Sequence, residues 1–280
     1  MEPNEKRPKI GLALGGGGSK GFAHIGIIKV LEENNITIDY IAGTSIGALI
    51  GGLYATTKDI KAIEEMATGT NWKEMLSMAD PTMKQGFFLG EKIKNWIDKN
   101  LHTKTFAETQ IPFSAIATDL NTGDLVIFND GNILDAIRSS ISVPIVLKPV
   151  ARNKQLLSDG GLSLPVPVSV VRDMGADFII AVNLENNYGK RDNVNLFSIA
   201  QNSLWILRLN LAKENIKTAD IVLVPKVVDP GWEAFLTKEK AIEVIKQGED
   251  IAREKLPEII AALEKYKRPS ILKTIKKIFN

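Results

Sequence analysis

The feature that most constrains the fold is a G-x-S-x-G pentad centred on Ser45, where one backbone pattern gives way to another. Residues 38–42 before it are largely apolar and predict a strand, whereas residues 46–55 predict a helix. A serine on such a sharp turn has its hydroxyl pushed out of the backbone, and Gly43 and Gly47 leave room for the neighbouring chain. The pentad therefore indicates that Ser45 is a nucleophile.

A glycine run at residues 15–21 follows a predicted strand and opens a predicted helix. Glycines at this place leave backbone N–H groups uncovered at a helix N-terminus, where they can bind negative charge. Gly16-x-Gly18-x-x-Gly21 matches the fingerprint for a dinucleotide pyrophosphate. The same amides can instead hold the oxyanion that forms when a serine attacks an ester.

The position of the acidic residue at the second predicted strand favours an oxyanion hole over dinucleotide binding as the role of the glycine run. A nucleotide-binding fold uses an acid at the far end of that strand to hold the ribose, whereas Asp39 lies at its start and Ser45 follows its end. A P-loop also fails, because Lys20 is followed by Gly21 rather than by Ser or Thr. A dinucleotide-dependent oxidoreductase remains the less favoured alternative.

Neither of the 2 histidines is placed for an α/β-hydrolase triad, in which the acid and then the histidine follow the serine. His24 precedes Ser45, and its pattern predicts a packed, hydrogen-bonded helix residue. His102 lies in a polar stretch and predicts a surface residue. Asp159 lies in a Ser-Asp-Gly-Gly segment after an apolar pair, residues 156–157, that predicts a strand end. It is the best candidate base, although Asp-Gly alone usually makes only a turn.

Together these motifs resemble those of the patatin-like phospholipase family. The glycine loop with its basic residue, the serine pentad and the Asp-Gly-Gly at 159–161 occur in the family's order, and the resemblance covers roughly residues 8–260. It implies a Ser–Asp dyad of Ser45 and Asp159. One departure is Leu164, which stands before a proline where the family commonly has Asn. This departure affects the expected loop geometry and not the dyad.

The resemblance also implies that backbone amides of Gly16, Gly17 and Gly18 form the oxyanion hole. Lys20, with Gly21, is expected to shape this loop or to add positive potential, because a cation in the first turn of a helix opposes the macrodipole. The alternative is that the lysine merely extends to solvent. An aspartate that takes a serine proton near neutral pH must have a raised pKa, so a desolvated Asp159 is expected.

The predicted fold is α/β, a patatin-like three-layer arrangement with a central, mainly parallel sheet, because strand and helix patterns alternate in a chain of 280 residues. A turn at 121–123 predicts a hairpin. The predicted strands are 9–14, 38–42, 113–118, 125–128, 178–183 and 221–224. The predicted helices are 22–34, 46–55, 58–68, 90–101, 195–218 and 238–263.

Composition narrows the function classes. With no cysteine, disulfides and thiol chemistry are excluded, which fits a cytoplasmic setting. No paired-histidine or calcium-loop spacing predicts a metal, and no cofactor is expected. A net charge of +2 gives no support for nucleic acid as a partner. No apolar stretch is long enough to span a bilayer, so a soluble protein is expected.

Two segments have alternative interpretations. Residues 1–264 are predicted to form the patatin-like domain, and 265–280 a basic amphipathic tail. The apolar and lysine faces of this tail fit an anionic membrane, or a helix that packs on the domain itself or on a partner chain. Residues 75–89 are apolar and predict an acyl pocket or simply core. The candidate pocket residues are Met78, Met83, Phe87 and Phe88.

The sequence thus predicts a serine-type lipid acyl hydrolase, a phospholipase or carboxylesterase that works through an acyl-enzyme on Ser45. Its expected substrate is a lipid or another acyl ester. The first alternative is a non-catalytic lipid-binding or regulatory module on the same fold. The oligomeric state is left open.

Overall fold

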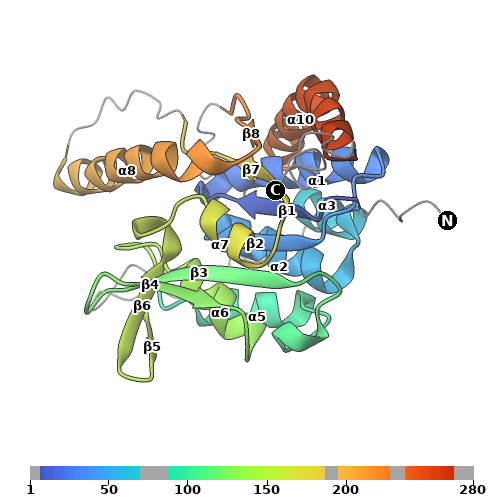
Figure 1. Ribbon diagram of the computed structural model, residues 1–280. Helices are drawn as coiled ribbons and strands as arrows, with labels where there is room; N and C mark the ends of the chain where they lie inside the picture. The colour runs from blue at the N-terminus through green and yellow to red at the C-terminus, as the bar shows by residue number, and fades with distance from the viewer. Residues whose placement is uncertain (1–6, 70–87, 187–194, 228–236, 268–280) are drawn as a thin grey trace, which may run out of the picture.

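The computed structural model describes residues 7–69, 88–186, 195–227 and 237–267. Its centre is an eight-stranded sheet in the order β5-β6-β3-β2-β1-β7-β8, with β4 paired to β3 (Figure 1). The strands are β1 Ile10–Leu14, β2 Tyr40–Thr44, β3 Phe113–Asp119, β4 Leu125–Phe128, β5 Val150–Arg152, β6 Gln155–Asp159, β7 Phe178–Val182 and β8 Ile221–Leu223. The helices are α1 Ala23–Glu33, α2 Ile46–Thr57, α3 Ile60–Thr68, α5 Glu91–Asn100, α6 Ile133–Ser140, α7 Val168–Asp173, α8 Leu196–Asn215 and α10 Lys238–Lys267.

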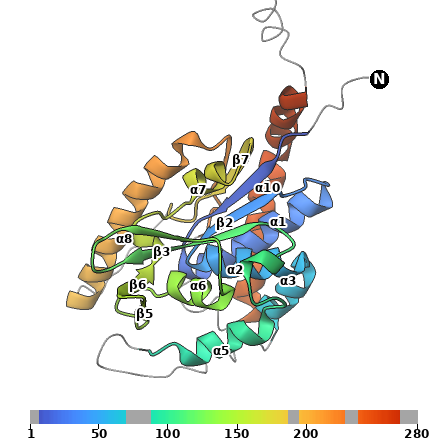
Figure 2. The same cartoon turned by 60° about the horizontal axis from the view of Figure 1, so that its bottom comes forward.

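The sheet is buried on both faces because its five parallel strands consist almost wholly of apolar and small residues. Alternate side chains of β1 point to opposite sides: Leu12 and Leu14 join the large core cluster, whereas Ala13 joins a smaller one. Figure 2 shows α1, α2 and α3 on one side of the sheet and α7 and α8 on the other. The predicted three-layer α/β fold with a mainly parallel sheet is confirmed.

The register of β3 brings two distant segments together. Ile116 of β3 pairs with Thr44, the last residue of β2, while the next residue, Ala117, pairs with Asp159 at the end of β6. On its other edge β3 pairs with β4 along the same stretch, so β6 continues the sheet where β2 stops. Asp159 consequently lies beside Ser45, the residue that follows β2.

The first and last described helices pack with their backbones in close contact. A Cβ on Gly26 of α1 would lie 2.0 Å from the carbonyl oxygen of Ile245, and one on Gly248 of α10 would lie 2.0 Å from that of Ala23. Both positions therefore require glycine. The C-terminal helix is thus held against α1, on the side of the sheet away from α7.

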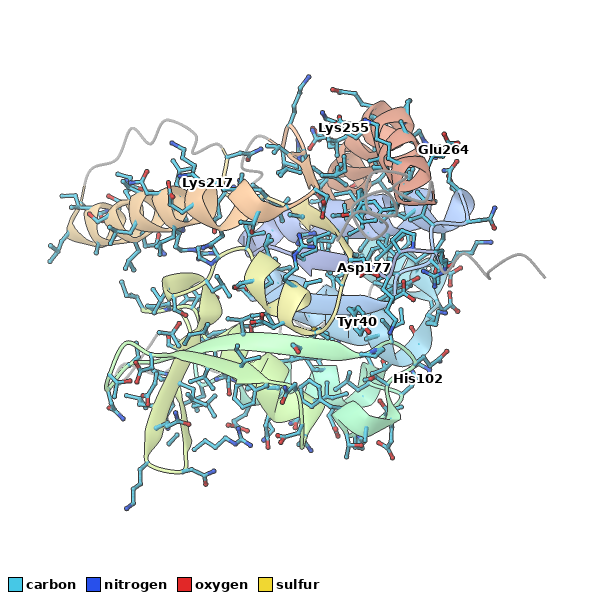
Figure 3. The ribbon with its side chains drawn as sticks, in the orientation of Figure 1. Tyr40, His102, Asp177, Lys217, Lys255 and Glu264 are labelled. Atoms are coloured by element: carbon cyan, nitrogen blue, oxygen red, sulfur yellow. The ribbon has the colours of Figure 1, made fainter. Side chains whose placement is uncertain are left out.

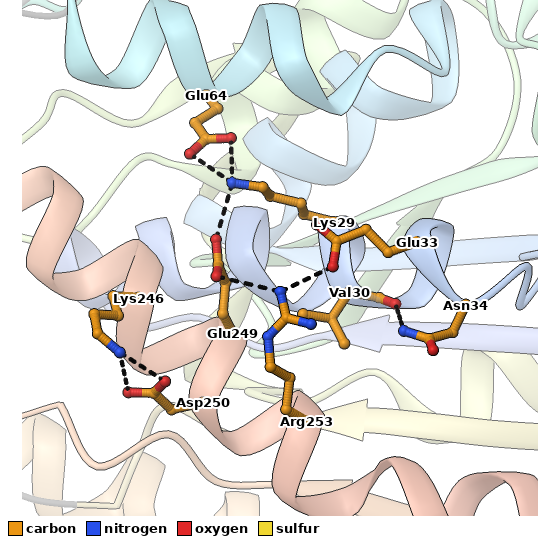
Figure 4. Close-up of polar contacts among 9 residues, drawn as sticks. All are labelled: Lys29, Val30, Glu33, Asn34, Glu64, Lys246, Glu249, Asp250 and Arg253. Carbon is orange, nitrogen blue, oxygen red and sulfur yellow. Dashed lines mark hydrogen bonds and ion pairs between the residues drawn. The ribbon is translucent and has the colours of Figure 1, made fainter.

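Ion pairs surround this helix contact (Figure 4). Lys29 of α1 contacts Glu64 of α3 and Glu249 of α10, each at 2.9 Å. Arg253 of α10 contacts Glu33 of α1 at 2.8 Å and Glu249 at 3.6 Å. Because these groups form a network across three helices, they fix the relative placement of those helices better than isolated surface pairs would.

Most predicted elements are present, with boundaries within a few residues. The hairpin at 121–123 is confirmed: β3 and β4 are antiparallel, and Gly123 adopts a φ of +82°. Of these strands and helices, β5, α6 and α7 were not predicted, and for β6 only a strand end at 156–157 was predicted. The division of the chain at residue 264 stays a prediction, although α10 continues to Lys267.

Candidate active site

Ser45 lies on a strained turn between β2 and α2, with φ +55° and ψ −122°. A non-glycine residue in such a conformation costs about 1–3 kcal/mol, which a surrounding structure must offset. A Cβ on Gly43 would lie 2.3 Å from the carbonyl oxygen of Gly47, and one on Gly47 would lie 2.2 Å from that of Leu14. The two elbow glycines are therefore required by close backbone approach, as the pentad predicts.

The hydroxyl of Ser45 donates a hydrogen bond of 2.5 Å from Oγ to Oδ2 of Asp159. The other carboxylate oxygen, Oδ1, accepts the amide of Gly161 at 2.7 Å. Both side chains are buried, with exposed fractions of 4% for Ser45 and 1% for Asp159. The structure thus brings together the two residues that the sequence places 114 positions apart.

Burial raises the pKa of Asp159 above the ordinary 3.8 of an aspartate. The positive charge of Arg208 and the hydrogen bonds from Ser45 and Gly161 oppose this rise, while the negative charge of Glu185 adds to it. The net direction is upward because desolvation is the largest contribution. The expectation of a desolvated Asp159 is confirmed, and a carboxylate of this kind is a better proton acceptor than an exposed one.

The glycine loop lies against the serine. A Cβ on Gly16 would lie 3.5 Å from Cβ of Ser45, and one on Gly21 would lie 2.1 Å from Cγ1 of Ile46, the residue after the serine. Gly18 adopts a φ of +58° at the start of the 3-10 helix η1 (Gly18–Phe22). Close approach at Gly21 and a left-handed backbone at Gly18 explain why this loop is rich in glycine.

One predicted oxyanion donor is corrected. The amide of Gly16 donates to the carbonyl oxygen of Pro165 at 3.0 Å, so the prediction that this N–H receives an oxyanion is wrong. Within the described part of the chain, the amides of Gly17 and Gly18 make no such backbone bond. These two amides stay the proposed donors.

Lys20 is buried, with an exposed fraction of 4%, so the alternative that it extends to solvent is wrong. Its Nζ donates to the carbonyl oxygen of Leu184 at 2.5 Å. Since Leu184 follows β7, this bond fastens the glycine loop to the neighbouring strand end. Of the two roles predicted for the lysine, shaping the loop is the one that this contact supports.

The two histidines lie where the sequence predicts. His24 is fully buried on α1, and its Nε2 bonds the carbonyl oxygen of Gly15 at 2.8 Å, so it acts as donor there. Burial lowers the pKa of His24 to about 4. Figure 3 shows His102 at the same end of the sheet as Tyr40, the first residue of β2. That end is opposite to the end that carries Ser45.

A buried ion pair that the sequence did not predict adjoins the dyad. Arg208 of α8 contacts Glu185, which follows β7, and both are nearly inaccessible. A Cβ on Gly16 would lie 2.7 Å from Nη2 of Arg208, and one on Gly161 would lie 2.8 Å from its Cζ. The guanidinium is therefore wedged between the glycine loop and the segment that carries Asp159. No motif surrounds either residue; the only signal was a single arginine in an otherwise uncharged helical stretch.

The remaining predicted residues have mixed outcomes. Met78, Met83 and Phe87 lie outside the described residues. Phe88 is half-buried, bridges to Leu147 and packs against the main core. Leu164 is buried, and its carbonyl oxygen accepts Thr44 Oγ1 at 2.8 Å, so this loop is tied to the residue before the nucleophile.

The described residues include no cluster of three or more His, Cys, Asp or Glu side chains that could hold a metal ion. None of the described helices combines the length and hydrophobicity needed to cross a membrane. Asp39 pairs with Arg7 at 2.6 Å and accepts the amide of Ile10 at 2.7 Å, at the end of the sheet away from the glycine loop. The carboxylate expected for a ribose is therefore not at that loop.

A family model for the patatin-like phospholipases matches residues 12–172, which span the glycine loop, the elbow and the Asp-Gly-Gly. The chain belongs to the patatin-like phospholipase family. The match covers more than half of the chain; it begins within β1 and includes β2, β3 and β6, the strands that place the dyad. The resemblance noted from the motifs is confirmed.

Relatives of this chain are larger proteins. It is 36% identical over 181 residues to an uncharacterized NTE family protein of Mycobacterium tuberculosis, covering 64% of this chain and 50% of the relative. It is 29% identical over 249 residues to patatin-like phospholipase domain-containing protein 6 of Homo sapiens, covering 85% and 17%. The chain therefore spans half or less of the length of these curated relatives. Among solved structures, VipD from Legionella pneumophila matches with a TM-score of 0.49 and 12% identity, over 93% of this chain and 67% of VipD.

Proposed function

We propose that this protein is a lipid acyl hydrolase, a phospholipase or carboxylesterase, that uses Ser45 as nucleophile and Asp159 as base. The observation that carries the proposal is the 2.5 Å bond from Ser45 Oγ to a buried carboxylate, made on a strained strand-to-helix turn. Membership of the patatin-like phospholipase family supports the substrate class.

The reaction has two halves. Ser45 Oγ attacks the carbonyl carbon of the ester while its proton passes to Asp159 Oδ2. The tetrahedral oxyanion is held by the amides of Gly17 and Gly18. When the intermediate collapses, the C–O bond to the alcohol breaks, Asp159 returns the proton to that oxygen, and the acyl group stays on Ser45.

Water completes the cycle. Asp159 takes a proton from a water molecule, whose oxygen attacks the acyl carbon and forms a second oxyanion at the same amides. Collapse breaks the bond to Ser45 Oγ, which recovers its proton from Asp159. The released product is a carboxylic acid, and both side chains return to their starting state.

Ser45→Ala tests this proposal with a soluble p-nitrophenyl acyl ester as substrate. The variant should lose at least about 10³-fold in kcat/KM while its circular dichroism matches that of the wild type, because the nucleophile alone is removed. Turnover that persists in the folded variant would exclude Ser45 as nucleophile. It would leave the lipid-binding module as the better account of the fold.

The tail at 265–280 carries a separate proposal, peripheral contact with an anionic membrane. Residues 268–280 lie outside the described part of the chain, and only the sequence pattern supports this contact. Deletion of residues 269–280 should weaken sedimentation with anionic vesicles, and added salt should do the same, because lysine contacts are screened. A fall in melting temperature with vesicle binding unchanged would show instead that the tail is a docked helix.

A further inference from the structure

One face of α8 exposes large apolar side chains that nothing in the catalytic chemistry uses. Their exposed fractions are 84% for Leu196, 50% for Ile199, 56% for Ile206, 60% for Leu207 and 36% for Leu211, and together they form the α8 apolar face. At 3.6 residues per turn these five positions fall within an arc of about 140°. The arc also contains the exposed, uncharged polar residues Ser203 and Asn210. A predominantly apolar face of this kind marks an interaction site.

The α8 apolar face carries no charge. Between Leu196 and Ala212 the only charged residue is Arg208, and it is buried toward the catalytic site. Exposed apolar residues on α10 differ: Ile242 and Ile260 are exposed to 47% and 43%, lie 18 positions apart, and each has glutamates within one helical turn. Isolated exposed residues are ordinary on a protein surface, whereas an uncharged face four turns long is not.

The opposite side of the same helix is part of the active site. Arg208 reaches Gly16 of the glycine loop and Gly161 beside Asp159. In Figure 1, α8 projects beyond the end of the sheet at which β2 leads into the elbow. A surface that covers the α8 apolar face would therefore contact the helix whose other side lies against the glycine loop and the segment of Asp159.

The chemistry of the expected substrate selects the occupant. Each methylene group lowers the partition coefficient of an acyl chain from hydrocarbon into water by about fourfold. Transfer of a long acyl chain through water is therefore very unfavourable. An enzyme that draws such a chain from a bilayer must hold its site at the lipid surface. We propose that the α8 apolar face docks on that surface; this assignment rests on the proposed acyl-ester hydrolase function. Since the face is uncharged, it fits uncharged or zwitterionic lipid.

The test uses the full chain and vesicles of ether-linked phosphatidylcholine, which cannot be hydrolysed at an acyl ester. We expect the wild-type protein to co-sediment with these vesicles, and 0.5 M NaCl to leave this binding unchanged. The double variant Ile199→Glu/Leu207→Glu should partition onto vesicles at least about tenfold more weakly than the wild type, because two apolar side chains that enter the lipid surface are replaced by charged ones. Its turnover of a soluble short-chain ester should equal that of the wild type.

The matched control is Ile242→Glu/Ile260→Glu on α10, which changes two exposed isoleucines, at 47% and 43%, outside the α8 apolar face. It should bind vesicles as the wild type does. Unchanged vesicle binding by the α8 variant, equal loss in both variants, or release of the wild type by salt would each overturn the proposal. So would a wild-type dimer that the α8 variant converts to a monomer while vesicle binding persists, since a second copy would then occupy the face. Turnover of a soluble ester is measured separately. If the wild-type protein does not turn the ester over, the hydrolase proposal fails. If it turns the ester over but does not bind vesicles, only the proposed docking of the α8 apolar face is refuted.

Discussion

The two sides of the candidate active site are built in different ways. On one side the glycine loop and the elbow place backbone against backbone, and glycines at Gly21, Gly43 and Gly47 permit contacts that any side chain would block. On the other side Glu185 and Arg208, from different elements, meet as a buried ion pair. The first side sets the geometry of attack, and the second sets the charge around the base. Short motifs encode backbone geometry, whereas this charge depends on long-range packing.

The largest effect is expected where the two sides meet. Asp159→Asn should reduce kcat/KM by at least about 10³-fold, because the amide cannot accept the serine proton. The variant should nevertheless melt no lower than the wild type at neutral pH. The pKa of Asp159 is above 3.8 in the folded protein, so the folded state keeps a proton that the unfolded chain has lost. Because of Asp159, the free energy of unfolding therefore decreases as the pH rises above 3.8, and it continues to decrease until the pH has passed the raised pKa of the folded protein.

Melting temperatures of both proteins between pH 4 and pH 8 check the sign. The melting temperature of the Asn variant relative to the wild type should increase with pH. A variant that loses stability relative to the wild type over this range would show that Asp159 is stabilised as an anion. That outcome would contradict the account of its basicity.

The next effect concerns the backbone side alone. In Gly17→Ala the new Cβ would lie 2.6 Å from Cβ of Leu184, so the loop must shift. If a displaced amide is an oxyanion donor, the variant should lose about 2–4 kcal/mol of transition-state stabilisation, seen mostly as a lower kcat. Gly123→Ala is the control, since it places a side chain at a φ of +82° in open space on the hairpin. It should lower stability by about 1–2 kcal/mol and leave kcat unchanged. A Gly17→Ala enzyme altered only in KM would mean that the loop binds ground-state substrate.

The Glu185–Arg208 ion pair should affect the pH dependence of catalysis. Arg208 lowers the pKa of Asp159 and Glu185 raises it. Arg208→Met should therefore move the acid limb of the kcat/KM–pH profile to higher pH, and Glu185→Gln should move it to lower pH. Each single variant also leaves a buried charge or polar group without its partner and should lose about 3–5 kcal/mol of stability.

The matched control for this pair is Lys213→Met, which removes an exposed charge from the same helix. Its acid limb should coincide with that of the wild type. If Arg208→Met and Glu185→Gln shift the limb in the same direction, the pair acts through packing rather than through charge. The two sides of the site would then not differ as proposed.

The smallest effect on activity is expected at the histidines. His24→Gln and His102→Gln should each retain at least about a tenth of the wild-type kcat/KM, because neither ring contacts the dyad. His24 has a pKa of about 4 in the folded protein against 6.5 for an ordinary histidine. The wild type should therefore lose stability as pH falls from 6.5 toward 4, on the order of 3 kcal/mol.

Urea unfolding at pH 7 and pH 4 tests this linkage. His24→Gln should lose less stability over that range than the wild type, whereas His102→Gln should behave as the wild type does. Abolished turnover in folded His102→Gln, together with active Asp159→Asn, would assign the base to the histidine and refute the dyad.

The same contrast explains what could be predicted from the sequence. Ser45, its elbow glycines and the long parallel strands are encoded in local patterns, and the structure has them where they were predicted. Only the end of β6 was predicted, from the apolar pair at 156–157; its full extent, Gln155–Asp159, and its partner depend on pairing with β3 and β5. The engaged amide of Gly16 depends on Pro165, which is 149 residues away. Arg208 and Glu185 depend likewise on tertiary packing, which a single sequence does not reveal.

Covalent labelling with a fluorophosphonate, followed by peptide mass spectrometry, tests the central claim most directly. The probe should form one adduct, on Ser45, because only this hydroxyl is activated by a buried carboxylate among the described residues. Asp159→Asn should label at least about 10²-fold more slowly, and Ser45→Ala should not label. An adduct at another residue, or labelling of Ser45 at the same rate without Asp159, would contradict the Ser–Asp dyad.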